Sequence, residues 1–269
     1  MASISAIVTT LNEEERIAEC LGHLAFADEV LVVDSFSTDR TAEIAGKLGA
    51  RVLQHEYRSP ASQKNWALEQ TSCDWALIVD ADELVTDDLA AEIRQVVANT
   101  DARDGYRIRR RNFFLGHEIR YSGWQNDRVL RLFRRDRGTH PERQIHEQVV
   151  VDGLVGDLTG TLLHYSYRSL DDYWRKLKRY AEWNAAEARS RGARVSPLYM
   201  MIHPGLRFWK AYLLQQGFRD GVPGLVVSLL TAVYAAAKDI RIWEQQAVAD
   251  QPEAARASRG LSSDDRRPD

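Results

Sequence analysis

The feature that most constrains the fold is a regular alternation of short apolar runs and amphipathic segments over the first hundred residues. Runs rich in Val, Ile and Leu have the length and composition of strands, and they cover residues 3–9, 29–33, 51–55 and 75–79. Segments with the helical spacing of apolar residues follow them, over residues 12–24, 39–48, 62–71 and 87–98. This alternation predicts parallel βα units, so the expected fold class is α/β, with the fully apolar run in a central strand.

Polar residues cluster directly after three of the expected strands. The clusters are Thr9 to Glu13, Asp34 to Asp39 and Asp80 to Glu83. Ligands of open α/β sheets bind outside the carboxyl ends of the strands, so these clusters are expected to converge on one crevice. Asp34 is the better candidate for contacting a ribose or a base. Asn12 and Asp39 are equally well explained as caps of the helices that follow them.

The sequence Asp80-Ala81-Asp82-Glu83 carries the strongest chemical signal. Two carboxylates at positions i and i+2, on the turn that leaves a buried strand, can present oxygen ligands to a divalent cation bound to a diphosphate. The alternative is that these acids belong to the cap of a helix that starts near Asp87. No G-x-G-x-x-G motif follows the first strand and no G-x-x-x-x-G-K-[ST] motif occurs, which disfavours dinucleotide-dependent oxidoreductases and P-loop kinases.

The chain divides by composition into three parts. Residues 1–168 are expected to form the ligand-binding and catalytic domain, and residues 169–246 a helical region. Residues 247–269 are small and charged, which is typical of a disordered tail. The only cysteines, Cys20 and Cys73, have no metal-ligand spacing and favour a reducing compartment. No signal-peptide pattern opens the sequence, so we expect a cytoplasmic protein.

An Arg-rich segment follows the expected α/β part. Residues 105–137 alternate apolar and Arg side chains, as half-buried antiparallel strands do. Some of these arginines are expected at an anionic acceptor site or at a membrane surface, namely Arg128, Arg131, Arg134 and Arg135. The formal net charge is −3 and no nucleic-acid-binding module is present, so nucleic acid is not an expected partner.

Two apolar, aromatic-rich runs lie in the helical region, at residues 198–218 and 222–237. The second run is shorter than a typical membrane-spanning helix and is opened by Pro223 and Gly224. Basic residues flank both runs. We therefore expect a pair of helices that lies on an anionic membrane surface, with the subunit interface of a homo-oligomer as the alternative.

Several sequences along the chain resemble glycosyltransferase family 2. They are AIVTTLNEEE, VLVVDSFSTDRTAEIAGKLGARV, QKNWALE, WALIVDADE, GYRIRRRNFFLG, DRVLRLFRR, IHE, LLHYSYRSLDDY and GFRDGVPG. The resemblance covers residues 3–245 and, within the family, is to lipopolysaccharide core glucosyltransferases that add a β-linked glucose. It implies the A-type nucleotide-sugar-binding fold, a single domain with a Rossmann-like mixed sheet, followed by a C-terminal helical extension.

The resemblance also implies roles for individual residues. Asp80 and Asp82 match the acid pair that holds Mg²⁺ or Mn²⁺ against the two phosphates of the donor, and His164 matches a late histidine that completes the metal site. The residues that match donor-binding positions are Thr9, Asn12, Glu13 and Asp34 for the uridine, Gln63, Lys64 and Asn65 beside the donor, and Ala81 within the acid pair.

The resemblance places the catalytic base at Glu147, in Ile145-His146-Glu147. The usual motif of the family ends in two adjacent acids, whereas this chain has a histidine before the glutamate. His146 and Asp127 are therefore alternative bases. A carboxylate that deprotonates the acceptor hydroxyl, with a metal ion on the departing diphosphate, gives inversion in a single displacement.

The expected function is metal-dependent, inverting transfer of a hexose, glucose from UDP-glucose, to a lipopolysaccharide inner-core acceptor on the inner face of the cytoplasmic membrane. The first alternative is another acceptor, such as an exopolysaccharide, another lipid-linked glycan or a protein side chain. A non-catalytic nucleotide-sugar-binding protein is a second alternative, which the intact pair Asp80 and Asp82 disfavours. A nucleotidyltransferase is disfavoured because no Gly- and Arg-rich phosphate loop follows the first strand.

Overall fold

The computed structural model describes residues 2–141 and 149–249. Contacts divide the chain into two compact units. The first unit, here called the sheet unit, contains residues 1–118 and 124–166. The second, here called the helical unit, contains residues 119–123 together with residues from 167 onward. A short segment from the middle of the sequence thus belongs to the C-terminal unit.

A nine-stranded sheet forms the centre of the sheet unit, and its order is β3-β2-β1-β4-β8-β6-β11-β5, with β7 paired to β6. The first four strands are parallel and are β1 (Ile4–Thr10), β2 (Glu29–Asp34), β3 (Arg51–Gln54) and β4 (Trp75–Asp80). Every residue of β4 except Asp80 is buried, and this strand lies between β1 and β8. The expected α/β class and the central position of the apolar run are confirmed.

The Arg-rich segment extends this sheet. The remaining strands are β5 (Glu83–Val85), β6 (Gly105–Phe114), β7 (His117–Ile119), β8 (Arg128–Arg134) and β11 (Val155–Tyr167). Strand β8 is antiparallel to both β4 and β6, and β11 is antiparallel to β5. A separate ribbon pairs β9 (Gly138–Thr139) with β10 (Val150–Val151). The mixed sheet follows from this change of strand direction after the fourth parallel strand.

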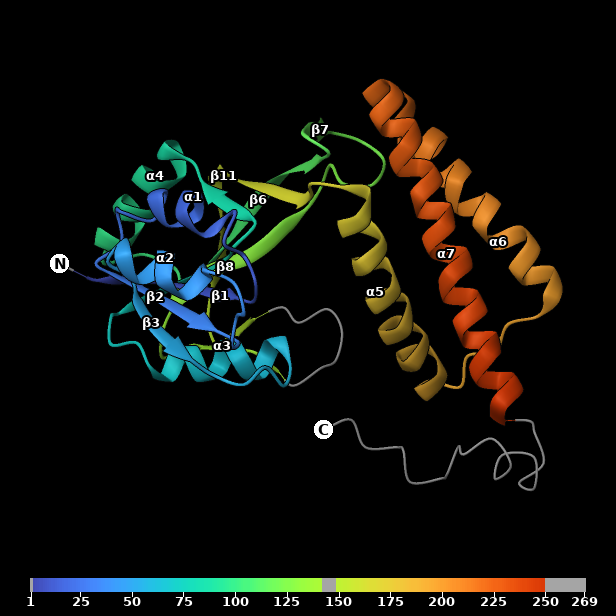
Figure 1. The fold of residues 1–269 in the computed structure, drawn as a ribbon. Coiled ribbons are helices and arrows are strands. Elements are labelled where there is room, and N and C mark those ends of the chain that lie inside the picture. Colours follow the sequence, from blue (N-terminus) through green and yellow to red (C-terminus); the bar gives the residue numbers. More distant parts are fainter. Residues whose placement is uncertain (1, 142–148, 250–269) are drawn as a thin grey trace. The chain divides into compact units, whose positions relative to one another are not determined.

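Helices cover both faces of the sheet (Figure 1). Helices α1 (Ile17–Gly22), α2 (Thr41–Lys47) and α4 (Asp87–Ala98) pack on one face, and α3 (Pro60–Glu69) packs on the other. Alternate residues of a strand point to opposite faces, so Ala6 and Val8 belong to the core under the first group whereas Ile7 belongs to the core under α3. Each parallel strand is therefore apolar on both sides.

The first two helices start later than their sequence patterns predict. Helix α1 begins at Ile17 rather than at residue 12, and α2 begins at Thr41 rather than at residue 39. Asn12 has a left-handed backbone conformation with φ of 56°, which a helix cannot include. The residues before both helices form loops at the carboxyl ends of β1 and β2, where they are bonded to one another instead.

Within residues 119–123 and 167–249, the helical unit contains three long helices, with short irregular turns between the second and third. They are α5 (Leu170–Ser190), α6 (Pro197–Trp209) and α7 (Gly221–Ala249), and residues 210–214 and 217–220 form a π-helical and a 3₁₀ turn. Helix α7 packs against both α5 and α6. Figure 1 shows α6 and α7 side by side.

Helix α7 is longer than predicted, because it continues past residue 237. Charged side chains in the added turns are paired: Arg241 bonds Glu182 at 2.9 Å and Glu244 at 2.8 Å, and Asp239 bonds Nδ1 of His203 at 2.6 Å. The charges therefore do not end the helix. The stretch 217–248 has a mean hydropathy of 1.5 in its most apolar window and is long and apolar enough to cross a membrane by these criteria alone. The expectation of a run too short to span was wrong.

Candidate active site

Residues 80–83, here called the acidic turn, connect β4 to β5. The turn is held by its own backbone and by its strand neighbours. Strand register places Thr9 of β1 opposite Asp80, and the backbone N–H of Asp80 donates to Glu83 Oε2 at 3.1 Å. Ala81 is buried and Glu83 has no exposed surface. The turn is fixed in this way, and it brings the carboxylates of Asp80 and Asp82 to the carboxyl edge of the parallel strands.

Cationic side chains from α3 and β8 surround Asp80. Lys64 Nζ lies 3.2 Å from Asp80 Oδ1, and Arg131 Nη2 donates to Asp80 Oδ2 and, at 2.7 Å, to Glu83. Desolvation raises the pKa of the Asp80 carboxyl, but the charges of Arg131 and Lys64 outweigh this effect and hold the pKa well below its usual value. Asp80 is therefore a carboxylate at every physiological pH.

Asp82 faces a histidine from the far end of the sheet. Strand register pairs His164 of β11 with Glu83, and the N–H of Tyr165 donates to the backbone oxygen of Asp82 at 2.9 Å. His164 Nε2 consequently lies 3.8 Å from Asp82 Oδ1. Arg16 also approaches the Asp82 carboxylate, at 3.9 Å. The three residues predicted to bind metal, Asp80, Asp82 and His164, thus come from β4, the turn after it and β11.

The donor chemistry at this position fits a divalent cation, because a carboxylate oxygen and an imidazole nitrogen face each other across a short gap. Asp80, in contrast, is engaged by Lys64 and Arg131. Within residues 2–141 and 149–249, no group of three or more His, Cys, Asp or Glu side chains has metal-binding geometry. Among the described residues, Asp82 and His164 thus form one facing carboxylate–imidazole pair.

The loops after β1 and β2 are bonded to each other. Asp34 is fully buried, and its carboxylate accepts hydrogen bonds from the N–H of Ser37 at 3.0 Å and from Thr10 Oγ1 at 3.3 Å. Asn12 Oδ1 accepts from the N–H of Thr38 at 2.8 Å, and Ser37 Oγ accepts from the N–H of Asn12 at 2.8 Å. Asp34 and Asn12 therefore shape these loops through their own side-chain oxygens.

The remaining residues predicted in this region also make defined contacts. The N–H of Glu13 donates to Thr41 Oγ1 at 2.8 Å, while Thr9 is half-buried within β1. Asp39 Oδ1 accepts from the N–H of Thr41 at 3.0 Å, one residue before the N-cap position of α2, which is Arg40. Although slight desolvation raises its pKa, the hydrogen bonds from Thr41 lower the pKa of Asp39 overall.

Helix α3 contributes three consecutive polar residues. Gln63 is buried and joins Ser35 Oγ at 3.0 Å to the ring of His55 at 2.9 Å. The side-chain amide of Asn65 bonds both the N–H and the backbone oxygen of His140, at 2.9 and 2.7 Å. Lys64, between them, points to Asp80. Of the three predicted donor-binding residues, Gln63 and Asn65 therefore make structural hydrogen bonds, and Lys64 reaches the acidic turn.

His140 is buried, and neither of its ring nitrogens has a hydrogen-bond partner among the residues that the structure describes. Burial, together with the charges of Lys64 and Arg131, lowers the pKa of His140 to about 3. The ring is therefore neutral at physiological pH. His140 has no signal in the sequence, because a lone histidine in a short strand-flanking segment carries no spacing pattern.

Among the predicted bases, only Asp127 lies within the described residues; His146 and Glu147 lie outside them. Arg110 donates two hydrogen bonds to the Asp127 carboxylate, both at 2.9 Å, and Asn112 Nδ2 donates a third at 2.9 Å. Desolvation raises the pKa of Asp127, but the hydrogen bonds and charge of Arg110 outweigh it and lower this pKa. A carboxylate held in this way is a weak proton acceptor.

Two arginines of the Arg-rich segment, Arg110 and Arg131, reach the site. Arg131 is buried and points to the acidic turn, which corrects the expectation that it faces an acceptor or a membrane. Arg110 likewise turns inward, to Glu83 and Asp127, whereas Arg107 and Arg128 pair with Asp157 at the surface. The period of two in β6 indicates Arg110, which shares its face with buried Ile108. Arg131 lies at the register shift between β8 and β6, where the alternation is interrupted, so this period does not indicate it.

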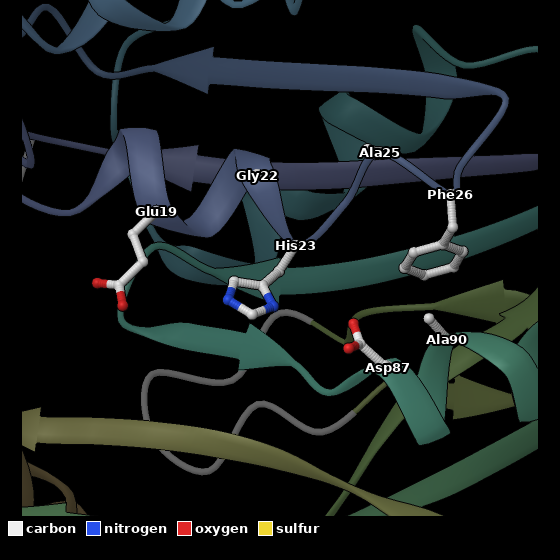
Figure 2. Close-up of a pocket in the computed structure, with 7 residues that line it drawn as sticks. All are labelled: Glu19, Gly22, His23, Ala25, Phe26, Asp87 and Ala90. Carbon is white, nitrogen blue, oxygen red and sulfur yellow. The ribbon is translucent and has the colours of Figure 1, made fainter.

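A pocket of about 430 Å³ lies elsewhere in the sheet unit, between α1 and the start of α4. Figure 2 shows its lining, in which the His23 side chain lies among apolar and acidic neighbours. His23 Nδ1 is bonded to the backbone oxygen of Val85 at 2.9 Å. None of the seven lining residues belongs to the acidic turn or to its cationic partners, so the chemistry described above lies outside this pocket.

A parallel α/β sheet that continues into antiparallel strands, with paired acids at the end of its central strand, defines an A-type glycosyltransferase fold. A sequence model of glycosyl transferase family 2 matches residues 5–159. The chain therefore belongs to glycosyltransferase family 2, and the resemblance found in the sequence is confirmed.

Relatives that align along nearly the whole chain agree with this membership. The chain is 30% identical over 256 residues to the lipopolysaccharide core biosynthesis glycosyltransferase LpsC of Rhizobium meliloti (strain 1021), covering 93% of this chain and 95% of LpsC. It is 29% identical to an uncharacterized glycosyltransferase of Rickettsia typhi, covering 90% of this chain and 86% of the relative. The crystal structure of S. aureus TarS 1–349 in complex with UDP-GlcNAc is 17% identical, with a TM-score of 0.45, and 97% of this chain and 93% of that chain are covered.

Proposed function

We propose that this protein is an inverting, metal-dependent glycosyltransferase that moves a hexose, glucose from UDP-glucose, to a lipopolysaccharide inner-core acceptor. The observation that carries the proposal is the arrangement at the acidic turn, where Asp82 faces His164 at 3.8 Å. Asp80 lies beside them and is paired with the side chains of Lys64 and Arg131. Membership of glycosyltransferase family 2 supplies the reaction class. The name of LpsC, which aligns along nearly the whole chain, supports the acceptor class.

Charge at the acidic turn supports a role in holding the diphosphate. Asp82 and His164 would hold Mg²⁺ or Mn²⁺, with Asp80 beside them, and the ion would act as a Lewis acid on the departing UDP. Lys64 and Arg131 add two positive charges at the same place. The diphosphate of the donor would accept hydrogen bonds from Lys64 and Arg131. These two side chains would then bond the donor in place of Asp80.

The base in this proposal is Glu147. Asp127 accepts three hydrogen bonds from Arg110 and Asn112, and its lowered pKa makes it a poor proton acceptor at neutral pH. His146 remains the second candidate. Replacing Glu147 with Gln removes the proton acceptor at nearly constant shape, so donor binding should be retained while sugar transfer is lost.

The helical unit supports contact with an anionic lipid surface, which would place the enzyme next to a lipid-linked acceptor at the cytoplasmic membrane. No residue of α6 is buried, and five large apolar side chains on or just after it are at least 55% exposed: Leu198 at 66%, Met201 at 81%, Leu206 at 60%, Trp209 at 55% and Leu214 at 80%. Exposed basic residues lie among them, at Arg207, Lys210 and Arg219. Apolar side chains interleaved with cations match a headgroup boundary.

Calorimetric titration tests the donor site. UDP, UDP-glucose, UDP-galactose and GDP-mannose are titrated with and without Mn²⁺ into the wild type, Asp82→Ala and a control, Asp157→Ala. Asp157 is a surface carboxylate that pairs with Arg107 and Arg128. We expect Mn²⁺-dependent binding of UDP and UDP-glucose that is lost in Asp82→Ala and kept in the control. Equal binding by Asp82→Ala would overturn the metal assignment, and absence of binding in the wild type would overturn the donor.

A further inference from the structure

A chain of hydrogen bonds runs from Asp127 to the ring of His164. Asn112 lies between them and is buried, with only 4% of its surface exposed. Its Nδ2 donates to Asp127 Oδ2 at 2.9 Å, and its Oδ1 lies 2.6 Å from His164 Nδ1. The three residues come from β6, β11 and the segment just before β8, so the sheet itself positions them.

The donor and acceptor of each hydrogen bond between Asp127 and His164 follow from the charge of Asp127. An ionised carboxylate only accepts hydrogen bonds, so the amide of Asn112 must turn its NH₂ group to Asp127. Its carbonyl oxygen is then directed at His164, and an oxygen at 2.6 Å requires a hydrogen on Nδ1. The opposite amide orientation would bring Asn112 Oδ1 against the carboxylate. Arg110, bonded twice to Asp127, keeps that carboxylate in place.

We propose that Asp127 and Asn112 are positioning residues that hold His164 in the tautomer with hydrogen on Nδ1, so that the lone pair of Nε2 points to Asp82. The proposal rests on the proposed metal site, because this lone pair is what a metal ion would use. Without the relay the ring would be free to place its hydrogen on Nε2, as a donor to the facing carboxylate of Asp82. That tautomer cannot bind a metal ion through Nε2.

A second neighbour of Nδ1 does not decide the tautomer. Ser166 Oγ lies 3.1 Å from His164 Nδ1, farther than Asn112 Oδ1. A hydroxyl both donates and accepts, so it is compatible with either tautomer. The Asn112 amide is held in one orientation. Its oxygen therefore selects the tautomer of His164 with hydrogen on Nδ1.

The tautomer is measurable in the metal-free protein. Long-range ¹H–¹⁵N correlation spectra of protein labelled at histidine distinguish a protonated from an unprotonated ring nitrogen, and His164→Gln identifies the signals of His164. In the neutral ring of the wild type we expect hydrogen on Nδ1 and none on Nε2. Hydrogen on Nε2 in the wild type would overturn the proposal, whatever the activity of the enzyme.

Four variants test the relay itself. Asn112→Leu and Asp127→Leu remove the fixed acceptor and the group that orients it, so both should shift hydrogen to Nε2. Asp127→Asn should keep the wild-type tautomer, because its oxygen still accepts from Asn112 and from Arg110, and Ser166→Ala should also keep it. An unchanged spectrum in Asn112→Leu contradicts the relay. If Asp127→Leu does not fold, Asn112→Leu gives the same answer because Arg110 and Asp127 remain paired.

Metal binding separates this inference from the proposed function. Mn²⁺ binding in the presence of UDP, followed by the electron paramagnetic resonance of free Mn²⁺, should weaken about 10- to 100-fold in Asn112→Leu, as is usual when a partner of a metal-bound histidine is lost. Wild-type protein that shows the expected tautomer but binds no Mn²⁺ would overturn the metal site and leave the relay standing. Equal Mn²⁺ affinity in Asn112→Leu and the wild type would overturn the role of the relay.

Discussion

Glu83 and Arg131 form an ion pair of 2.7 Å in which neither side chain is exposed by more than 8%. The pair joins β5 to β8 at the acidic turn, and the Arg131 guanidinium also forms an ion pair with Asp80. Buried charges are tolerated only when their partners are present. The stability of the sheet unit and the shape of the acidic turn therefore depend on the same guanidinium.

Arg131→Met should lower the free energy of unfolding by about 3 kcal/mol, because it leaves Asp80 and Glu83 with fewer opposite charges in a buried site. Urea denaturation measures this loss. Arg128→Met, on the same strand, is the matched control: its partner Asp157 is at the surface, and the expected change is below about 1 kcal/mol. Equal losses in the two variants would contradict the importance assigned to the buried pair.

Stability should fall between pH 7 and pH 5 because of His140. The folded protein holds the pKa of His140 at about 3, whereas the unfolded chain binds a proton near pH 6.5. Below that pH the unfolded state therefore takes up a proton that the folded state does not, and stability is lost as the pH falls. The loss from this residue alone is about 2 kcal/mol at pH 5.

His140→Asn isolates this contribution, since an asparagine does not titrate while every other group is unchanged. Unfolding of both proteins in urea at pH 7 and pH 5 gives the difference. The variant should lose about 2 kcal/mol less than the wild type between the two values. Parallel behaviour of the two proteins would show that His140 titrates normally in the folded state.

Binding to vesicles that contain phosphatidylglycerol should depend on the exposed apolar residues of the helical unit. Met201→Asp and Leu214→Asp each replace a side chain that is at least 80% exposed, so folding should be unaffected. Each loses roughly 1.5 kcal/mol or more of apolar burial in lipid, which is a tenfold loss of affinity in co-sedimentation.

Leu154→Asp, at a 69% exposed position of the sheet unit, is the control and should bind as the wild type does. Extraction of the bound protein with alkaline carbonate separates surface contact from insertion. Resistance to extraction would mean that the apolar stretch 217–248 crosses the bilayer instead. Unchanged binding in both aspartate variants, with a change of subunit number, would favour an oligomer interface.

Two glycines of the helical unit should respond in opposite ways to alanine. A Cβ at Gly224 would lie 1.9 Å from the backbone oxygen of Gly217, so Gly224→Ala should destabilise the unit by about 1–3 kcal/mol. Gly205, within α6, has no atom near the same position, so Gly205→Ala should stabilise it by about 0.5–1 kcal/mol. Thermal unfolding followed by circular dichroism tests both signs, and destabilisation by Gly205→Ala would contradict the open environment described for α6.

Local patterns predicted the elements of the sheet unit well, because a parallel strand that is buried on both faces must be continuously apolar. Residues 75–79 and the acids after them are the best example. The start of α1 could not be predicted in the same way, since Asn12 leaves the helix to bond Thr38, which is distant in sequence. Helix α7 continues past the apolar run 222–237, and a charge beyond that run is paired, since Asp239 bonds His203.

The candidate site was predictable to a similar degree. Strand ends indicated where Asp34, Asp80 and Asp82 lie, but not what their oxygens contact. Asp34 proved to be enclosed by Ser37 and Thr10, and Asp80 to be paired with two cations. The role of Asn112 had no signal in the sequence, because it depends on strand register that brings β6 beside β11.

Residues 119–123 belong to the helical unit although they lie between two strands of the sheet unit. Tyr121 donates its N–H to Asp220 at 2.8 Å and lies under the guanidinium of Arg219, while the N–H of Ser122 bonds the backbone oxygen of Gln215 at 3.0 Å. A chimaera made by one cut near residue 167 would separate the helices from this segment. Exchange of C-terminal parts between relatives therefore requires two grafts, and the segment and the helices must diverge together during evolution.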